Sequence, residues 1–317
     1  MFRMDGAPLL VATEHQPENH VMKFGIDLRP EALAAAVLLV APMLAAALCP
    51  SAMEKLAQML PRMVCVFAPA ALCAPYAMTA QAFGIFRWGW LAVYALLPAA
   101  VAFLLDQARN ADAGRRGNWR DYAVLLLLGL AVDLRWLEPA WPARLAALGK
   151  IVLLDAGIFG FLVVRRLDGV GFDLRLTWKD VRRGILEYLL YAVIAIPLGL
   201  WLGFLHVHSI VPAPLRVIGA FVFTFVFIAI PEELFFRGWL QNLLERRMGR
   251  TFALLSTAIL FGLSHWNKRA LHFNWRYVLM AAIAGVFYGR AWLAQRRVGA
   301  SALTHASVDT TWSIWLR

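Results

Sequence analysis

The chain has 317 residues, of which 61% are hydrophobic and 16% are charged, and its net charge is +11. Soluble domains are about half apolar and a quarter charged, so this composition excludes an ordinary soluble domain and indicates a multi-pass membrane protein. The basic residues fall between apolar runs and no nucleic-acid-binding motif is present. The positive charge is therefore typical of loops that face anionic lipid, and no nucleic-acid partner is expected.

The predicted fold class is all-α: a polytopic transmembrane helix bundle with about eight to ten spans, because a spanning helix needs about 20 apolar residues and open sheet edges cannot lie in lipid. Residues 1–29 are expected to form a polar tail without the pattern of a signal peptide. The predicted spans are residues 31–49, 63–83, 88–105, 122–137, 145–164, 185–205, 215–240, 252–266, 277–294 and 300–316.

Three basic loops connect these spans, at residues 106–121, 165–184 and 245–250. The positive-inside rule places all three in the cytoplasm, although the basic residues between 268 and 276 would then face the opposite side. In the second loop, Thr177 is expected to cap a helix that lies on the membrane surface and then turns inward.

The loop at 165–184 is the predicted domain boundary. Residues 30–184 would be N-terminal transmembrane helices of unknown role, and residues 185–317 would be the functional core, because the unusual polar residues gather there. The protein is expected to be integral to the membrane, and to the inner membrane if its source is bacterial.

Two adjacent glutamates, Glu232 and Glu233, interrupt a long apolar run, and Arg237 follows Glu233 on the same helical face. One carboxylate in hydrocarbon costs roughly 2.5–3.5 kcal/mol on insertion scales, so ionisable groups at this depth usually mark chemistry or transport. The pair Glu233–Arg237 is equally compatible with a structural ion pair, whereas Glu232 has no local partner.

Two further polar signals follow. Phe261 and His265 are four residues apart at the end of one apolar run, and His305 and Asp309 are four apart in the last predicted span. Each pair occupies one helical face. The predicted helices can therefore bring two carboxylates and two imidazoles to one intramembrane pocket. Asp133, Arg135 and Asp155 also lie in apolar runs, where they either pair across helices or line a water path.

This set of side chains is sufficient for hydrolysis of an amide by water. A carboxylate held away from bulk water can act as general base, an imidazole can share that role, and further donors can stabilise the oxyanion. No serine or cysteine nucleophile with an adjacent base is apparent, so direct attack by water is the simpler interpretation.

The order EExxxR, FxxxH, HxxxN/D on successive late helices resembles the CPBP intramembrane proteases, also called the Abi family, which includes the type II CAAX prenyl endopeptidases. The resemblance covers roughly residues 185–317. It implies an intramembrane glutamic endopeptidase that acts on a membrane-associated peptide or protein within the lipid bilayer.

The resemblance also implies individual roles. Glu232 would activate water with help from His265, and His305 with residue 309 would form the oxyanion site. The orienting or wall-forming residues would be Glu233, Arg237 and Phe261. The chain departs from the common pattern at Asp309, where asparagine is usual; an ionised carboxylate cannot donate to an oxyanion, so Asp309 must be protonated, orient His305 or serve another purpose.

Two alternatives remain open on the sequence. The same Glu, His and Asp side chains could hold zinc, but the expected mechanism uses no cofactor, because open catalytic zinc sites show three clear ligands. The chain could also be a transporter, a proton relay, or a silent immunity or scaffold protein. A transporter predicts inverted repeats, which are not apparent.

Overall fold

The structure is a computed structural model that describes residues 29–268 and 272–317. These residues form helices and connecting loops and contain no strand, which confirms the predicted all-α fold. Apart from Arg29, the predicted polar tail lies outside the described residues. The helices are α1 (Pro30–Leu48), α2 (Pro50–Met59), α3 (Arg62–Phe67), η1 (Ala68–Leu72), α4 (Cys73–Ala82), α5 (Trp88–Asn110), α6 (Trp119–Asp133), η2 (Glu138–Ala140), η3 (Ala143–Leu145), α7 (Ala147–Ile158), η4 (Phe159–Val164), α8 (Trp178–Trp201), α9 (Pro214–Thr224), η5 (Phe225–Ala229), α10 (Ile230–Glu233), η6 (Leu234–Gln241), α11 (Asn242–Met248), α12 (Arg250–Leu263), α13 (Trp275–Gln295) and α14 (Val298–Trp315).

Among the described residues, 7 helical stretches are long and apolar enough to cross a membrane. The chain is therefore a multi-pass integral membrane protein. Three of the predicted spans correspond to helices that are not among these 7, namely α6, α12 and α14. The helices α6 and α12 have only 15 and 14 residues. The helix α14 is not among the 7, because its serine, threonine, histidine and aspartate side chains lower its hydropathy.

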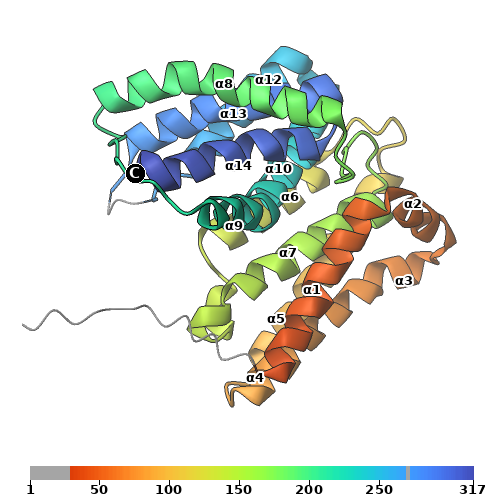
Figure 1. The fold of residues 1–317 in the computed structure, drawn as a ribbon. Coiled ribbons are helices and arrows are strands. Elements are labelled where there is room, and N and C mark those ends of the chain that lie inside the picture. The colour runs from red at the N-terminus through yellow and green to blue at the C-terminus, as the bar shows by residue number, and fades with distance from the viewer. Residues whose placement is uncertain (1–28, 269–271) are drawn as a thin grey trace, which may run out of the picture.

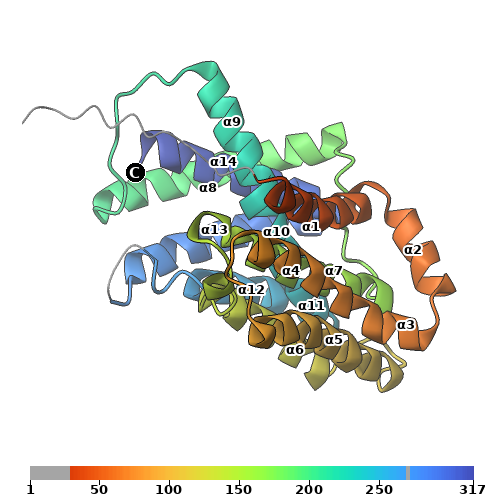
Figure 2. The same cartoon turned by 90° about the horizontal axis from the view of Figure 1, so that it is seen from below.

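The helices form two groups (Figure 1). On one side, α8 packs against α13 and α14, and α12 packs against α13. On the other side, α1 packs against α4 and α7, and α5 packs against α6 and α7. Figure 2 shows the same separation from below, with α2 to α5 on one side and α8, α13 and α14 on the other.

The loop between η4 and α8 joins the two groups through close backbone contacts. Gly171 has a φ of +71°, and a Cβ at this residue would lie 2.1 Å from the carbonyl oxygen of Arg296. The Val298 N–H donates to the Gly171 carbonyl at 2.8 Å. Only glycine combines this left-handed conformation with such a close approach, so Gly171 fixes the loop against the start of α14.

The first turn of α8 confirms the predicted cap. The Thr177 side chain accepts a hydrogen bond from the Asp180 N–H, and the Asp180 side chain accepts one from the Thr177 N–H, which together form a capping box. From this cap α8 runs without interruption to Trp201 and is itself a candidate span. The expected surface helix and the inward turn are therefore one continuous helix.

The stretch from Pro214 to Met248 is a single candidate span of 35 residues, longer than the predicted 215–240. Its middle contains two π-helical segments, η5 and η6, on either side of the short helix α10. Pro231 lies in α10 and cannot donate a backbone hydrogen bond, and the wider π turns before and after it accommodate that interruption. This irregular part of the helix carries the paired glutamates.

Candidate active site

Glu232 and Glu233 occupy the end of α10 and have different surroundings. The side chain of Glu233 is 0% exposed, whereas that of Glu232 is 37% exposed. Successive residues of a helix point about 100° apart, so one carboxylate faces the helix packing and the other faces an opening. The sequence distinguishes the two glutamates only through the position of Arg237.

Three side chains bind the buried carboxylate of Glu233. Arg237 Nη1 donates to Oε1 at 3.0 Å, and His305 Nδ1 donates to the same oxygen at 2.9 Å. The hydroxyl of Ser301 donates to Oε2. Arg237 also donates to the Gly285 carbonyl at 2.9 Å and lies over the Phe261 ring at 4.7 Å. Glu233 thus joins α10, η6 and α14, and its lone pairs are directed to these partners.

His305 lies between the two glutamates. Its Nδ1 is bound to Glu233, while its Nε2 is 3.9 Å from Glu232 Oε2 and 3.4 Å from Asp309 Oδ2. The ring of Tyr288 stacks on the imidazole, with centroids 4.6 Å apart and planes 15° apart. These contacts fix the ring, so that Nε2 is the nitrogen directed toward Glu232 and Asp309.

A cavity of about 250 Å³ opens beside these groups. The four residues predicted to take part in catalysis all line it, namely Glu232, His265, His305 and Asp309. Phe261 forms part of the wall, as expected, and Glu233 and Arg237 lie behind the wall rather than in it. Because one water occupies about 30 Å³ of liquid, the cavity has room for several waters or for part of a peptide.

His265 differs from its expected position, because α12 ends at Leu263 and His265 lies in the turn that follows. Its Nδ1 bonds to the Phe261 carbonyl at 2.8 Å. A carbonyl oxygen can only accept, so Nδ1 is the donor in this contact and Nε2 is the ring nitrogen left for other partners. Phe261 and His265 were predicted to share one helical face, and in the structure they are in direct contact although His265 lies outside the helix.

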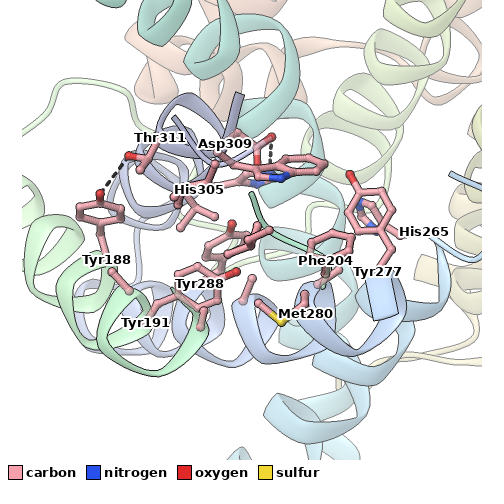
Figure 3. A pocket seen from close by; sticks show the side chains of 18 of the residues that line it. Tyr188, Tyr191, Phe204, His265, Tyr277, Met280, Tyr288, His305, Asp309 and Thr311 are labelled. Atoms are coloured by element: carbon pink, nitrogen blue, oxygen red, sulfur yellow. Dashed lines mark hydrogen bonds and ion pairs between the residues drawn. The ribbon is translucent and has the colours of Figure 1, made fainter. Parts of the chain in front are cut away.

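Aromatic side chains supply much of the cavity wall (Figure 3). Tyr188 of α8 and Thr311 of α14 share a hydrogen bond of 2.9 Å between their hydroxyl oxygens. Tyr191, Tyr277 and Trp312 also line the cavity, and the Tyr277 ring packs against His265 with centroids 5.0 Å apart. The acidic and imidazole groups are thus set among aromatic side chains, as is common in sites for ligands that are largely apolar.

Two residues of this site were not singled out from the sequence. Ser301 binds Glu233 and lies four residues before His305, so the spacing 301, 305 and 309 forms one polar stripe along α14 that could have been recognised. Tyr288 stacks on His305 from α13 and has no distinguishing feature in its own segment. Its role follows only from the packing of α13 against α14.

The arrangement of the donor groups bears on whether the site could hold a metal ion. Within residues 29–268 and 272–317, no three His, Cys, Asp or Glu side chains are grouped so that they could share a metal ion. Among these residues the donor groups as arranged do not form a three-ligand zinc site. Whether activity depends on a metal stays a prediction for a chelator experiment.

Comparison with known proteins identifies the part of the chain that carries these residues. Residues 214–311 match the model of the type II CAAX prenyl endopeptidase Rce1-like family. The resemblance noted in the sequence is thereby confirmed for this Rce1-like segment. No curated protein and no solved structure matches the chain.

The Rce1-like segment begins with α9 and ends within α14, so it includes all of the predicted site residues. It does not include α8, which supplies Tyr188 and Tyr191 to the cavity. The family supports an intramembrane CAAX-type protease, and such an enzyme acts on membrane-associated substrates.

Proposed function

We propose that this chain is an intramembrane glutamic endopeptidase, in which Glu232 activates a water molecule that attacks a peptide bond of a membrane-associated peptide or protein. The observation that carries the proposal is the unequal environment of the two glutamates. Glu233 is bound by Arg237, Ser301 and His305, whereas Glu232 is part of the cavity wall beside two imidazoles.

In this mechanism the Glu232 carboxylate takes a proton from water as the oxygen attacks the scissile carbonyl. In this proposal His265 offers Nε2 as a second acceptor, because its Nδ1 donates to the Phe261 carbonyl. The proton is then returned to the leaving nitrogen, so the general base becomes the general acid for breakdown of the tetrahedral intermediate. No covalent enzyme intermediate is required.

The oxyanion of the tetrahedral intermediate is assigned to the region around His305 Nε2. This nitrogen is directed into the acidic side of the cavity, and the stacked ring of Tyr288 holds it there. Asp309 lies 3.4 Å from Nε2 and orients it, which explains how an aspartate can occupy a position where asparagine is usual. A fixed donor of this kind typically contributes a factor of about 10²–10³ to the rate.

The proposal is tested with the purified full-length protein in lipid nanodiscs. Its substrates are a farnesylated peptide of the CAAX type and a pool of N-acylated peptides, and products are located by mass spectrometry. Glu232→Gln is expected to reduce cleavage by about 10²–10⁴-fold, the usual contribution of a general base. Glu54→Gln, which changes an exposed glutamate of α2, serves as the matched control. Equal cleavage by Glu232→Gln and the parent would overturn the proposal.

A further inference from the structure

A second cavity, of about 550 Å³, adjoins the one described above. Its lining residues come from two distant parts of the sequence and are Asp133, Leu134, Arg135, Asn267, Lys268 and Tyr277. Lys268 and Tyr277 line both cavities. The two cavities therefore meet at this pair, and an extended chain bound beside Glu232 can continue into the second cavity.

The N-terminal half of the chain supplies one side of this second cavity. Asp133 is the last residue of α6, and Leu134 and Arg135 follow it, all outside the Rce1-like segment. The helix α6 packs closely against η6: a Cβ at Gly129 would lie 3.2 Å from the Phe235 ring. This contact holds the end of α6 beside the helix that carries the glutamates.

Arg135 and Lys268 are the cationic side chains that line this cavity, and Arg135 can still bind a further hydrogen-bond acceptor. The Arg135 side chain is 67% exposed, and its Nε is 4.0 Å from Glu138 Oε2, which is beyond hydrogen-bonding distance. The other oxygen of Glu138 is bound by Lys150 Nζ at 3.1 Å. Lys268 and Asp133 also line the cavity, so its ionisable lining groups are two cations and one carboxylate and carry a net positive charge.

The backbone at Arg135 gives a second, independent observation. Its φ is 55°, in the left-handed region that favours glycine. Trp136 N–H donates to the Ala131 carbonyl at 3.1 Å, so Arg135 is the left-handed residue that follows the C-cap Leu134 of α6 in a Schellman-type turn. A long side chain retained at such a position is a reason to look for a function of that side chain.

Arg135 can be compared with the other arginines that have a positive φ. Arg166 also has a positive φ and donates to the Ala57 carbonyl. Arg296 has a positive φ and binds Glu245 with hydrogen bonds of 2.7 and 2.6 Å. Arg115, the remaining arginine with a positive φ among the described residues, pairs with Asp168 at 3.5 Å. Arg135 has the longer ion pair, at 4.0 Å with Glu138, and it lines the second cavity.

We propose that the second cavity is a substrate subsite that binds a carboxylate of the peptide, with Arg135 and Lys268 as its donors. This inference rests on the proposed function, since it concerns the part of the peptide that extends beyond the cleavage site. It assigns a role in substrate selection to the end of α6. The carboxylate can come from an aspartate or glutamate side chain or from the C-terminus of the peptide.

The test measures binding, so that it does not depend on turnover. Full-length protein carrying Glu232→Gln in nanodiscs is exposed to pools of N-myristoylated peptides with six randomised residues. One pool has free C-termini and a second has amidated C-termini, and captured peptides are identified by mass spectrometry. The expected result is capture of carboxylate-bearing peptides about threefold to tenfold above neutral ones, as for a partly exposed charge pair. Enrichment in the free-acid pool alone identifies the C-terminus, and enrichment of Asp and Glu in the amidated pool identifies a side chain.

Arg135→Gly is the decisive variant, because glycine relieves the left-handed backbone while removing the guanidinium. Its thermal midpoint should equal or exceed that of its background, and its preference for carboxylates should fall to less than about twofold. Lys268→Gln should lower the preference in the same direction. Arg115→Gly is the matched control, since Arg115 also has a positive φ but precedes the opposite end of α6.

Equal capture of acidic and neutral peptides, or an unchanged preference in Arg135→Gly, would overturn this inference. These outcomes are distinct from failure of the proposed function. Cleavage by the parent protein without any carboxylate preference would contradict the subsite alone. In the other case the parent protein cleaves no peptide, but it prefers carboxylates and Arg135→Gly removes that preference. This result would support the carboxylate subsite and contradict the proposed protease activity.

Discussion

Glu232 and Glu233 are neighbours in sequence, yet the side chain of the first is 37% exposed at a cavity and that of the second is 0% exposed. Arg237, Ser301 and His305 bind the second carboxylate, whereas the first lines the cavity and has a longer contact, of 3.9 Å, with His305 Nε2. Substitutions at these two positions should therefore have different consequences. Changes around Glu233 should act on stability, and changes at Glu232 should act on the reaction.

Arg237→Leu should lower stability strongly. It would leave the fully buried Glu233 carboxylate without its charged partner, and breaking a buried pair from one side costs about 3–5 kcal/mol. The measurement is unfolding in detergent, followed by circular dichroism. Lys150→Ala is the control, because it removes a partly exposed pair with Glu138 and should change stability by about 0–1 kcal/mol. Equal midpoints for both variants would contradict the structural role of Arg237.

Asp309→Asn should preserve cleavage to within about tenfold of the parent rate, because the amide retains contact with His305 Nε2 and can donate to an oxyanion. Asp309→Ala should lower the rate by about 10²–10³-fold, since it removes the group that orients that nitrogen. The ratio of the two rate constants on one peptide is the relevant quantity. Equal losses in both variants would show that the carboxylate itself is required.

Asp173 should make stability depend on pH in the acidic range. Hydrogen bonds from Arg175 and the nearby charge of Arg297 lower the pKa of Asp173 to about 2, in a loop outside the candidate spans. An aspartate in the unfolded chain titrates near about 3.9. Because the folded-state pKa is the lower one, the stabilisation is present above about pH 4 and is lost as the pH falls toward 2.

The comparison of the parent with Asp173→Asn isolates this contribution from that of other carboxylates. The thermal midpoints of the two proteins should differ most above pH 4 and should converge as the pH approaches 2. A difference that stays constant across this range would show that Asp173 contributes through something other than its charge.

Asp155 and Asp121 are both buried, but replacing each with leucine should change the free energy of unfolding in opposite directions. Both carboxyl oxygens of Asp155 lack a hydrogen-bond partner among the described residues, and the residue is 5% exposed. Asp155→Leu should therefore raise the free energy of unfolding by about 1–3 kcal/mol. Asp121 is bound by Arg165 Nε at 2.7 Å, so Asp121→Leu should lower it by about 3–5 kcal/mol.

Chemical denaturation in mixed micelles would measure both variants. A loss of stability in Asp155→Leu would mean that the carboxyl group has a role that its packing does not reveal. If that variant also loses cleavage, the Asp155 carboxyl group would be needed for activity, and its burial would not be merely an unfavourable feature of the fold.

Local patterns in the sequence were sufficient for much of the site. The spacings of Phe261 with His265 and of His305 with Asp309 place each pair together in any helix, and the structure brings all four beside Glu232. The cap at Thr177 was also predictable, because a capping box depends on residues three positions apart. The His305–Asp309 pair and the Thr177 cap need only the geometry of one helix, whereas His265 contacts Phe261 from the turn that follows α12.

Features that depend on packing between distant segments were not predictable. The contact of Tyr288 with His305 requires the arrangement of α13 against α14. Asp133 and Arg135 were expected either to pair or to line a path, and they line a cavity with Lys268, more than 130 positions later in the sequence. The π segments on either side of Pro231 have no simple sequence signature beyond the proline itself.

The most direct test of the central claim compares three cleavage rates on one membrane-anchored peptide: those of the parent, of Glu232→Gln, and of the parent with a strong zinc chelator. The account predicts that Glu232→Gln loses about 10²–10⁴-fold in rate with an unchanged thermal midpoint, and that the chelator has no effect. A Glu232→Gln variant as active as the parent would contradict the assignment of the general base. Loss of the parent's activity in chelator, restored by added zinc, would contradict the metal-free mechanism.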